Sequence, residues 1–223
     1  MEKNISTNKT TIKKLQKKKA LNKAGAKIFA KEGFINSSIK SITDEAQVAV
    51  GTFYSYFNSK EDVLSAIYDD LLRESIYSSR KIADGVKNSD DVSFIFTKAL
   101  TEAVLIYARN KEASKIVLSK GAGINEVLEE KRFQLIDKTI EYIEDVLNHL
   151  NSVHSIKIAD IKITSIMITQ SILGVITYWI KDRISDSIDQ MILSICIFQL
   201  NALNISFDES KIKNCITSIV KQE

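Results

Sequence analysis

The chain has 223 residues, of which 44% are hydrophobic and 26% charged, and it contains no proline and only 7 glycines. These proportions are ordinary for a globular protein, and the shortage of helix breakers favours an all-α fold. Two cysteines near the C-terminus, Cys196 and Cys215, and an N-terminus without an apolar segment argue against a secreted, disulfide-stapled protein. We therefore expect a cytoplasmic location.

The charge is unevenly distributed along the chain. Residues 1–60 carry 12 lysines and four acidic residues, a net charge of 12 − 4 = +8. The remainder carries 31 − 12 = 19 basic and 28 − 4 = 24 acidic residues, a net charge of −5. A basic head on a mildly acidic body is typical of a protein that binds a polyanion, either nucleic acid or an anionic membrane surface. For residues 1–12 the alternative is a solvated lysine tail.

From about Lys13 onward the chain is predicted to form helices with short breaks. Leu21, Gly25 and Phe29 recur at helical spacing, and Gly33 follows the last of them, where a glycine commonly ends a helix. A second, short helix is predicted next, with Ser37 or Ser38 as its N-cap and one narrow apolar face.

The stretch 50–57 is predicted to form only a short third helix, because Asn58 and Ser59 intervene before the next one. Phe53 and Phe57 are four residues apart, so they share one face and are predicted to pack against the two preceding helices. Two short helices joined by a tight turn, within a basic segment, indicate a helix-turn-helix unit.

The N-terminal residues of a recognition helix read bases in the major groove, so we expect Val50, Gly51 and Thr52 to lie deepest there. A glycine in a helix costs about 1 kcal/mol relative to alanine, and it is tolerated where another backbone, here the DNA, comes close. Hydroxyl groups of the next turn are expected to reach phosphates. They belong to Tyr54, Ser55 and Tyr56.

The ordered pattern resembles the N-terminal domain of the TetR (tetracycline-repressor) family over about residues 21–64. The residues that carry the resemblance are Phe29, Gly33, Ile39, Ile42, Ala46, Val48, Gly51, Phe53, Tyr54, Tyr56, Phe57, Lys60, Glu61 and Leu64. The resemblance implies DNA contacts at Ser38, Val50, Gly51, Thr52, Tyr54, Ser55, Tyr56 and Lys60. It also implies that a ligand in the body shifts the helix at about 60–83 and so changes the distance between two recognition helices.

Three residues depart from the family pattern. Gln47 stands where the family has a turn glycine, so the turn lacks an easy left-handed residue. Ala49 replaces a serine or threonine, which removes a helix cap worth about 1 kcal/mol. Thr43 replaces an alanine. In addition, Val50 cannot hydrogen-bond a base and could only contact a thymine methyl group.

Beyond the head, residues 1–58, the body of residues 59–223 shows helical periodicity without a long linker. The predicted helices are 60–83, 91–109, 111–119, 124–151, 157–181, 185–204 and 209–221. The glycines at 121–123 fit a helix C-cap better than a dinucleotide fingerprint, since no strand precedes them. His149 and His154 are five apart, without metal-ligand spacing. No catalytic motif is present, so we expect no enzyme, no cofactor and no metal.

The stretch 161–180 is about long enough to span a membrane, but Lys162, Gln170 and five hydroxyl residues argue against a span. This helix and residues 191–200 are apolar all round, which is typical of helices buried on more than one side. In a TetR-like chain they match the homodimer interface, a four-helix bundle made by the helices at 157–181 and 185–204. The alternative is a monomeric core.

The resemblance also implies an apolar ligand cavity between residues 60 and 181. Ordinary core packing is the alternative for each of its candidate lining residues. They are Tyr77, Phe94, Tyr107, Phe133, Tyr142, Met167, Gln170 and Trp179. Their character fits a hydrophobic or acyl compound better than a sugar phosphate.

Two functions remain open. The first is a dimeric transcriptional repressor that a small ligand releases from a palindromic DNA operator. The second is a non-sensing architectural protein that uses its lysines on DNA or an anionic surface. The aromatic and hydroxyl pattern from 50 to 57 favours the first, because binding without sequence preference needs only the lysines.

Overall fold

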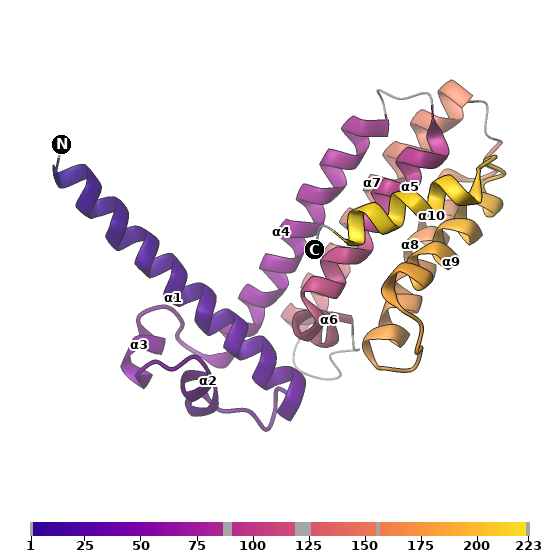
Figure 1. Cartoon of the computed structure of the whole chain (residues 1–223). Helices are drawn as coiled ribbons and strands as arrows, with labels where there is room; N and C mark the ends of the chain where they lie inside the picture. Colours follow the sequence, from indigo (N-terminus) through magenta and orange to yellow (C-terminus); the bar gives the residue numbers. More distant parts are fainter. Residues whose placement is uncertain (1, 87–90, 119–125, 155–156, 222–223) are drawn as a thin grey trace.

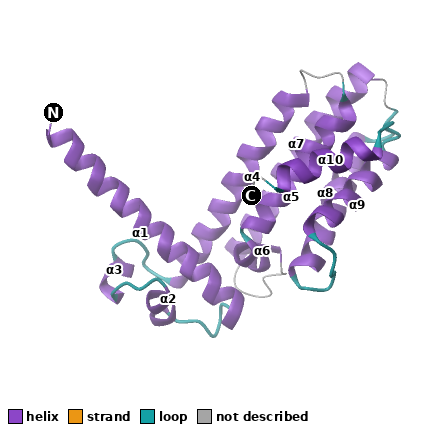
Figure 2. Ribbon diagram, in the orientation of Figure 1, coloured by secondary structure: helices purple, strands orange, loops and turns teal. Residues whose placement is uncertain are grey.

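The computed structural model describes residues 2–86, 91–118, 126–154 and 157–221 (Figure 1). Within these ranges all regular structure is helical, which confirms the all-α prediction (Figure 2). The helices are α1 (Glu2–Glu32), α2 (Ile39–Glu45), α3 (Val50–Tyr54), α4 (Lys60–Val86), α5 (Val92–Arg109), α6 (Lys111–Leu118), α7 (Glu126–His154), α8 (Ile161–Ile180), α9 (Ile188–Ala202) and α10 (Glu209–Val220).

Short polar side chains set where several helices begin. The carboxylates of Asp91, Asp160 and Asp208 accept hydrogen bonds from the first free backbone N–H groups of α5, α8 and α10. Each such cap satisfies donors that have no partner inside the helix. At the other end of α1, Gly33 adopts a φ of 79° and terminates the helix, as predicted.

The first three helices form a small unit, which we call the head, and α4 connects it to the remaining helices, the body (Figure 1). In the head, α1 packs against α2 and α4. Gly25 lies on α1 where it crosses α4, and a Cβ atom there would sit 2.4 Å from Cγ1 of Val63. Close approach of two helices therefore explains this glycine, since Val63 is fully buried and β-branched.

The body is built around α5, which contacts α4, α6, α8, α9 and α10, while α7 packs between α4 and α8. Its core is aliphatic and includes the fully buried Leu147, Ile176, Ile192 and Ile212. The short helix α6 contacts α1 as well as α8, so it joins the head to the body beside α4.

Several predicted boundaries were wrong. The structure continues α1 back to Glu2, so residues 2–12, for which a solvated tail was the alternative, are helical. Likewise α4 continues through Gly85 to Val86, and α7 extends to His154. A single glycine costs a helix only about 1 kcal/mol relative to alanine, so it need not end α4. The glycines at 121–123 lie outside the described residues.

Among the described helices, α8 alone is long and apolar enough to cross a membrane by length and composition, and 39% of its most apolar window is buried inside the protein. It packs against α5, α6 and α7, so we interpret it as a helix of the body.

Candidate nucleic-acid interface

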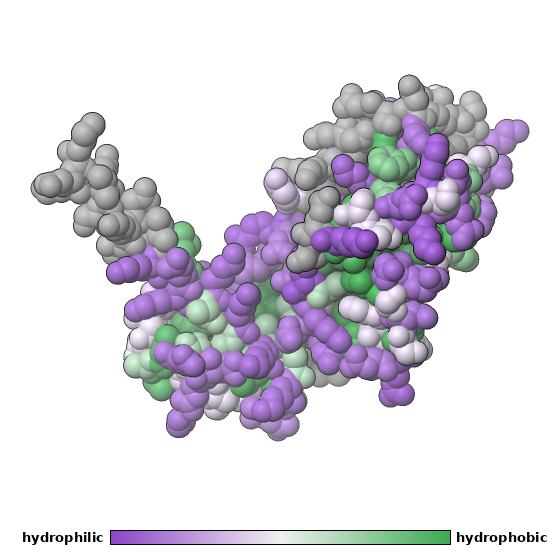
Figure 3. All heavy atoms as spheres, in the orientation of Figure 1, coloured by the Kyte–Doolittle hydropathy of each residue, from purple (hydrophilic) through white to green (hydrophobic). Residues whose placement is uncertain are grey.

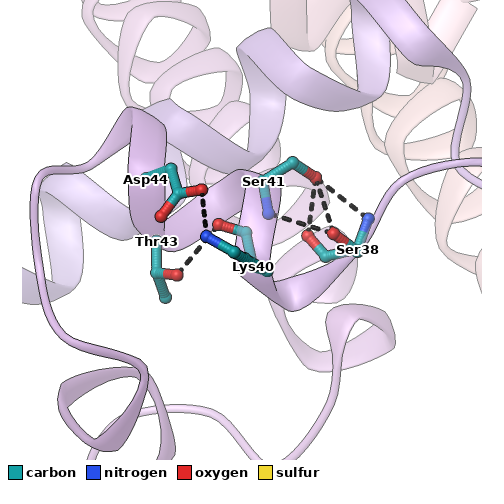
Figure 4. A network of polar contacts seen from close by, with 5 residues as sticks. All are labelled: Ser38, Lys40, Ser41, Thr43 and Asp44. Carbon is teal, nitrogen blue, oxygen red and sulfur yellow. Dashed lines mark hydrogen bonds and ion pairs between the residues drawn. The ribbon is translucent and has the colours of Figure 1, made fainter.

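The start of α2 is fixed by a reciprocal pair of serines (Figure 4). The Ser38 hydroxyl accepts from the backbone N–H of Ser41 at 3.0 Å, and the Ser41 hydroxyl accepts from the backbone N–H of Ser38 at 3.0 Å. This is a capping box in which a serine replaces the usual glutamate or glutamine. Ser37 is buried instead, and its hydroxyl donates to the carbonyl of Phe34. The sequence left both serines open as caps, and the structure selects Ser38.

The turn between α2 and α3 places Gln47 in the left-handed region, with a φ of 54°. Its N–H donates to the carbonyl of Asp44, and the N–H of Val48 donates to the carbonyl of Thr43. These two bonds define a Schellman motif, in which the left-handed residue is usually glycine. The chain thus keeps the turn of the family pattern and accepts backbone strain at Gln47.

Helix α3 begins at Val50, and its N-cap residue, Ala49, makes no side-chain cap hydrogen bond, as the sequence indicated. The helix is held by its buried face instead. Phe53 is fully buried, Phe57 is 4% exposed, and their ring centroids lie 5.8 Å apart. Both rings belong to the buried core of the protein, which also contains Ile42 and Phe29, and α3 packs against α2.

The residues opposite this anchor are turned to solvent. Val50 is 44% exposed and Tyr54 is 57% exposed, while Gly51 and Ser55 are also exposed. A Cβ atom at Gly51 would meet nothing within 4 Å, so the protein itself leaves room for another molecule there. Thr52 and Tyr56 are half-buried.

Lys60, predicted to hold a phosphate, has three acceptors inside the head. Its Nζ atom donates to the carbonyls of Phe34, Ile35 and Ser37, at 2.8, 3.1 and 3.0 Å. It also lies 4.6 Å from the ring centroid of Phe34. An ammonium group has three N–H donors, so all of them are occupied in this arrangement. In the structure, Lys60 links the start of α4 to the loop that follows α1.

Charge around the helix-turn-helix is only partly neutralised within the head. Lys27 pairs with Glu45 at 2.6 Å, and Lys40 pairs with Asp44 at 2.7 Å. The lysines from 13 to 19 are exposed. Figure 3 shows hydrophilic side chains over most of the visible face of both head and body.

The body contains an apolar cavity of about 100 Å³ between α5, α7 and α8. Tyr107 and Tyr142 line it, which agrees with two of the predicted ligand-site residues. Burial raises the pKa of Tyr107 to about 12, so it stays a neutral phenol at physiological pH. Sequence reasoning missed Thr169, which also lines the cavity and is 1% exposed. Within the described residues its hydroxyl has no hydrogen-bond partner.

The other predicted lining residues do not line this cavity. Phe94, Phe133, Met167 and Gln170 are exposed, and so is Tyr77, which borders the groove between head and body. Aromatic identity does not reveal which side of a helix faces inward, so the sequence could not separate these residues from those that line the cavity.

Trp179 is half-buried near the C-terminal end of α8, away from the cavity lining. Its indole N–H donates to the carbonyl of Asp186, and Nζ of Lys111 lies 5.4 Å from the ring centroid. Trp179 therefore packs at the contact between α6 and α8.

One face of α8 is exposed along its length, although the helix is apolar. Met167 is 60% and Tyr178 is 62% exposed, and Ile163, Gln170 and Gly174 continue the same line at spacings of three and four residues. A neighbouring helix, α9, exposes Phe198. Exposed apolar residues at helical spacing are typical of a helix–helix contact.

Comparison with known proteins finds a family model that matches most of the head and the start of α4. Residues 21–67 match the family model described as bacterial regulatory proteins, tetR family. The uncharacterized HTH-type transcriptional regulator YvdT of Bacillus subtilis is 26% identical over 133 residues, which cover 60% of this chain and 66% of YvdT. The fatty acid metabolism regulator protein of Bacillus subtilis is 24% identical over 169 residues, which cover 71% of this chain and 81% of that protein.

Solved structures agree with the fold over most of the chain. The structure of the transcriptional regulator FadR from Bacillus subtilis in complex with stearoyl-CoA matches with a TM-score of 0.67 at 18% identity, and the match covers 81% of this chain and 96% of that one. A likeness at this identity establishes the arrangement of the helices.

Proposed function

The chain is a TetR-family transcriptional regulator and not an enzyme, and we propose that it acts as a dimeric repressor that a small hydrophobic ligand releases from a palindromic operator. The observation that carries the proposal is the short helix α3, in which Phe53 is buried on one side while Val50 and Tyr54 are exposed on the other.

Base reading is assigned to the start of α3. Val50 and Thr52 occupy the N-terminal turn, where a recognition helix meets base edges, and Gly51 lets the DNA come close. The exposed phenol of Tyr54 and the hydroxyl of Ser38 are placed on neighbouring elements to reach phosphates.

A second copy of the chain is assigned to the exposed face of α8 that contains Met167 and Tyr178. A two-fold dimer presents two recognition helices to successive major grooves, which requires a palindromic site. Burying these side chains against their copies would remove apolar surface from water.

The ligand is assigned to the cavity between α5, α7 and α8. A cavity of about 100 Å³ is smaller than an engineered protein cavity of roughly 150 Å³ that binds benzene. A ligand of biological size must therefore separate these helices when it enters. The lining supports an apolar compound, and Thr169 offers a buried hydroxyl group to its polar end. The complex of the FadR neighbour with stearoyl-CoA makes acyl compounds the first to test.

Polar contacts along α4 provide a route from the cavity to the head. Asp69 pairs with Lys131 of α7, and Asp70 accepts a hydrogen bond from Asn22 of α1. A movement of α7 would therefore displace the same stretch of α4 that is hydrogen-bonded to α1 of the head. A tenfold loss of operator affinity needs a ligand preference of only about 1.4 kcal/mol for the non-binding arrangement.

Selection of bound duplexes from a random pool tests the DNA-binding proposal. We expect the purified protein to enrich one palindromic sequence, and Val50→Ala and Thr52→Ala to change which bases are preferred. Tyr54→Phe should weaken specific and non-specific DNA alike. Enrichment of no sequence, or of a sequence without two-fold symmetry, would favour the non-sensing architectural alternative.

A cavity variant tests the ligand proposal. Thr169→Val removes a buried hydroxyl that lacks a partner, so the ligand-free protein should gain about 1 kcal/mol of unfolding free energy, and stearoyl-CoA should bind less tightly. Thr101→Val is the matched control, because the Thr101 hydroxyl is buried and donates to the carbonyl of Thr97 at 2.7 Å. Thermal unfolding with and without stearoyl-CoA measures both effects. Equal responses of the two variants would contradict the assignment.

A further inference from the structure

The part of α1 before Leu21 extends beyond the packed head. Among the residues whose burial the structure describes, Leu21 is the first buried one, and all side chains from 13 to 20 are exposed. Figure 1 shows the N-terminal half of α1 running away from the other helices. At 1.5 Å per residue, residues 2–20 form an arm of about 28 Å. We call this segment the lysine arm.

The charged residues of the arm and of the rest of α1 are almost all basic. Between positions 3 and 31 the chain has ten lysines and no aspartate or glutamate. Lys13 and Lys17, and likewise Lys14 and Lys18, are separated by four residues and lie on the same side of the helix. Like charges at this spacing destabilise a helix in water, and opposite charges that could offset them are absent from this stretch. A polyanion laid along the arm would remove this repulsion.

The arm leaves the head beside the recognition helix. Lys14, Lys18, Leu21 and Gly25 share one face of α1, the face on which Gly25 touches α4. Nζ of Lys18 lies 5.5 Å from the ring centroid of Phe57, the buried ring that follows α3. The lysine face of the arm therefore continues outward from the turn that carries the phenol groups of Tyr54 and Tyr56.

We propose that the lysine arm binds the sugar–phosphate backbone of the DNA that flanks the half-site read by α3. Double-stranded DNA carries about one charge per 1.7 Å of its axis, so an arm of about 28 Å passes enough phosphates to engage the exposed lysines from 13 to 19. Lysine contacts of this kind carry no base preference. The arm therefore raises affinity and lengthens the bound site while leaving base choice to α3. The inference rests on the proposed function, because it needs α3 to be on DNA.

The test compares two sets of four substitutions in the full chain. One variant carries Lys13→Gln, Lys14→Gln, Lys17→Gln and Lys18→Gln. The control carries the same change at exposed lysines of the body, Lys98, Lys157, Lys211 and Lys213. Fluorescence anisotropy with a duplex of mixed sequence is measured over a series of NaCl concentrations. We expect the salt slope of the arm variant to fall by about 0.9 for each phosphate that the arm no longer neutralises, and that of the control to stay unchanged.

A cross-linking measurement locates the contact directly. A photoreactive residue replaces Leu15, which is 63% exposed on the arm, and in a second protein it replaces Phe133, which is 51% exposed on the body. We expect DNA cross-links from position 15 only. Equal salt slopes for the two lysine variants, or no cross-link from position 15, would overturn the inference.

Two further outcomes distinguish a DNA contact of the arm from a membrane contact, and failure of this inference from failure of the proposed function. Unchanged DNA binding together with lysine-dependent binding to phosphatidylserine vesicles would assign the arm to a membrane surface and overturn the proposal. If the unsubstituted protein binds no duplex at all, the proposed function fails and the inference falls with it, whereas normal DNA binding by the arm variant overturns the inference alone.

Discussion

The head and the body differ in how their functional residues come together. In the head, the residues that we propose to face DNA lie on one short helix and its flanks, and two buried rings, Phe53 and Phe57, decide which side is exposed. In the body, the cavity is lined by three helices that lie far apart in the sequence. A site on one element can therefore be predicted from periodicity, whereas a site between elements depends on how the helices are rotated against each other.

The largest effect is expected from a variant that prevents the body from forming a dimer while it leaves the head intact. Met167→Glu combined with Tyr178→Glu puts two charges on the exposed face of α8. We expect a monomer, and a loss of about 10²–10⁴ in operator affinity because the two heads are no longer linked. Analytical ultracentrifugation and DNA titration measure the two effects.

Phe133→Glu is the control, since Phe133 is also an exposed apolar residue but lies on α7. A double variant that stays dimeric, or a control that dissociates as well, would show that the α8 face is not the interface.

The next effect concerns the contact between α1 and α4. Gly25→Val places side-chain atoms where Val63 already lies, because even a Cβ atom would come within 2.4 Å of it. We expect the unfolding free energy to fall by about 3 kcal/mol, since neither helix can move freely. Chemical denaturation followed by circular dichroism measures the loss. Gly51→Ala meets no atom within 4 Å, so it should not lower stability but should weaken DNA binding; a similar stability loss in both variants would contradict the account.

A test at Lys60 separates a structural role from a DNA contact. Lys60→Met leaves three backbone carbonyls without their donor, and we expect a loss of about 2 kcal/mol in unfolding free energy with an unchanged salt slope of DNA binding. Lys40→Met is the control, because its exposed pair with Asp44 should contribute less than about 1 kcal/mol. A stable Lys60→Met protein whose salt slope has fallen would restore the phosphate contact predicted from the sequence.

The smallest effect is expected at the turn between α2 and α3 in the head. Gln47→Gly relieves a left-handed residue with a φ of 54°, and we expect a gain of about 1 kcal/mol in unfolding free energy. Ala46→Gly, at a neighbouring residue with a right-handed φ of −76°, should instead cost up to about 1 kcal/mol. If the turn is built as described, thermal unfolding will show a higher melting temperature for Gln47→Gly and a lower one for Ala46→Gly than for the unsubstituted protein.

The sequence predicted most of the head because its signals are local. The spacing of Phe53 and Phe57, the glycine at 33 and the serine cap of α2 each depend on a few neighbouring residues. The contacts of Lys60 inside the head could not be predicted, for the opposite reason. Its acceptors belong to residues 34–37, more than twenty positions earlier, and backbone carbonyls leave no mark in a side-chain pattern.

In the body, the all-helical character and most helix positions followed from periodicity, but the cavity did not. Tyr107 and Tyr142 were found, whereas Phe94 and Phe133 turned out to be exposed and Thr169 was overlooked. A threonine in a helix usually bonds back to a carbonyl one turn earlier. Only the packed structure reveals that the hydroxyl of Thr169 makes no such bond.

The central claim is that a ligand in the body changes the spacing of the two recognition helices, and a distance measurement in the dimer tests it most directly. A nitroxide label at Asn58→Cys, an exposed position between α3 and α4, reports this spacing by double electron–electron resonance once Cys196 and Cys215 are replaced by alanine. We predict that stearoyl-CoA shifts the distance over the same concentration range in which it releases operator DNA. Release of the DNA with an unchanged distance would contradict the claim.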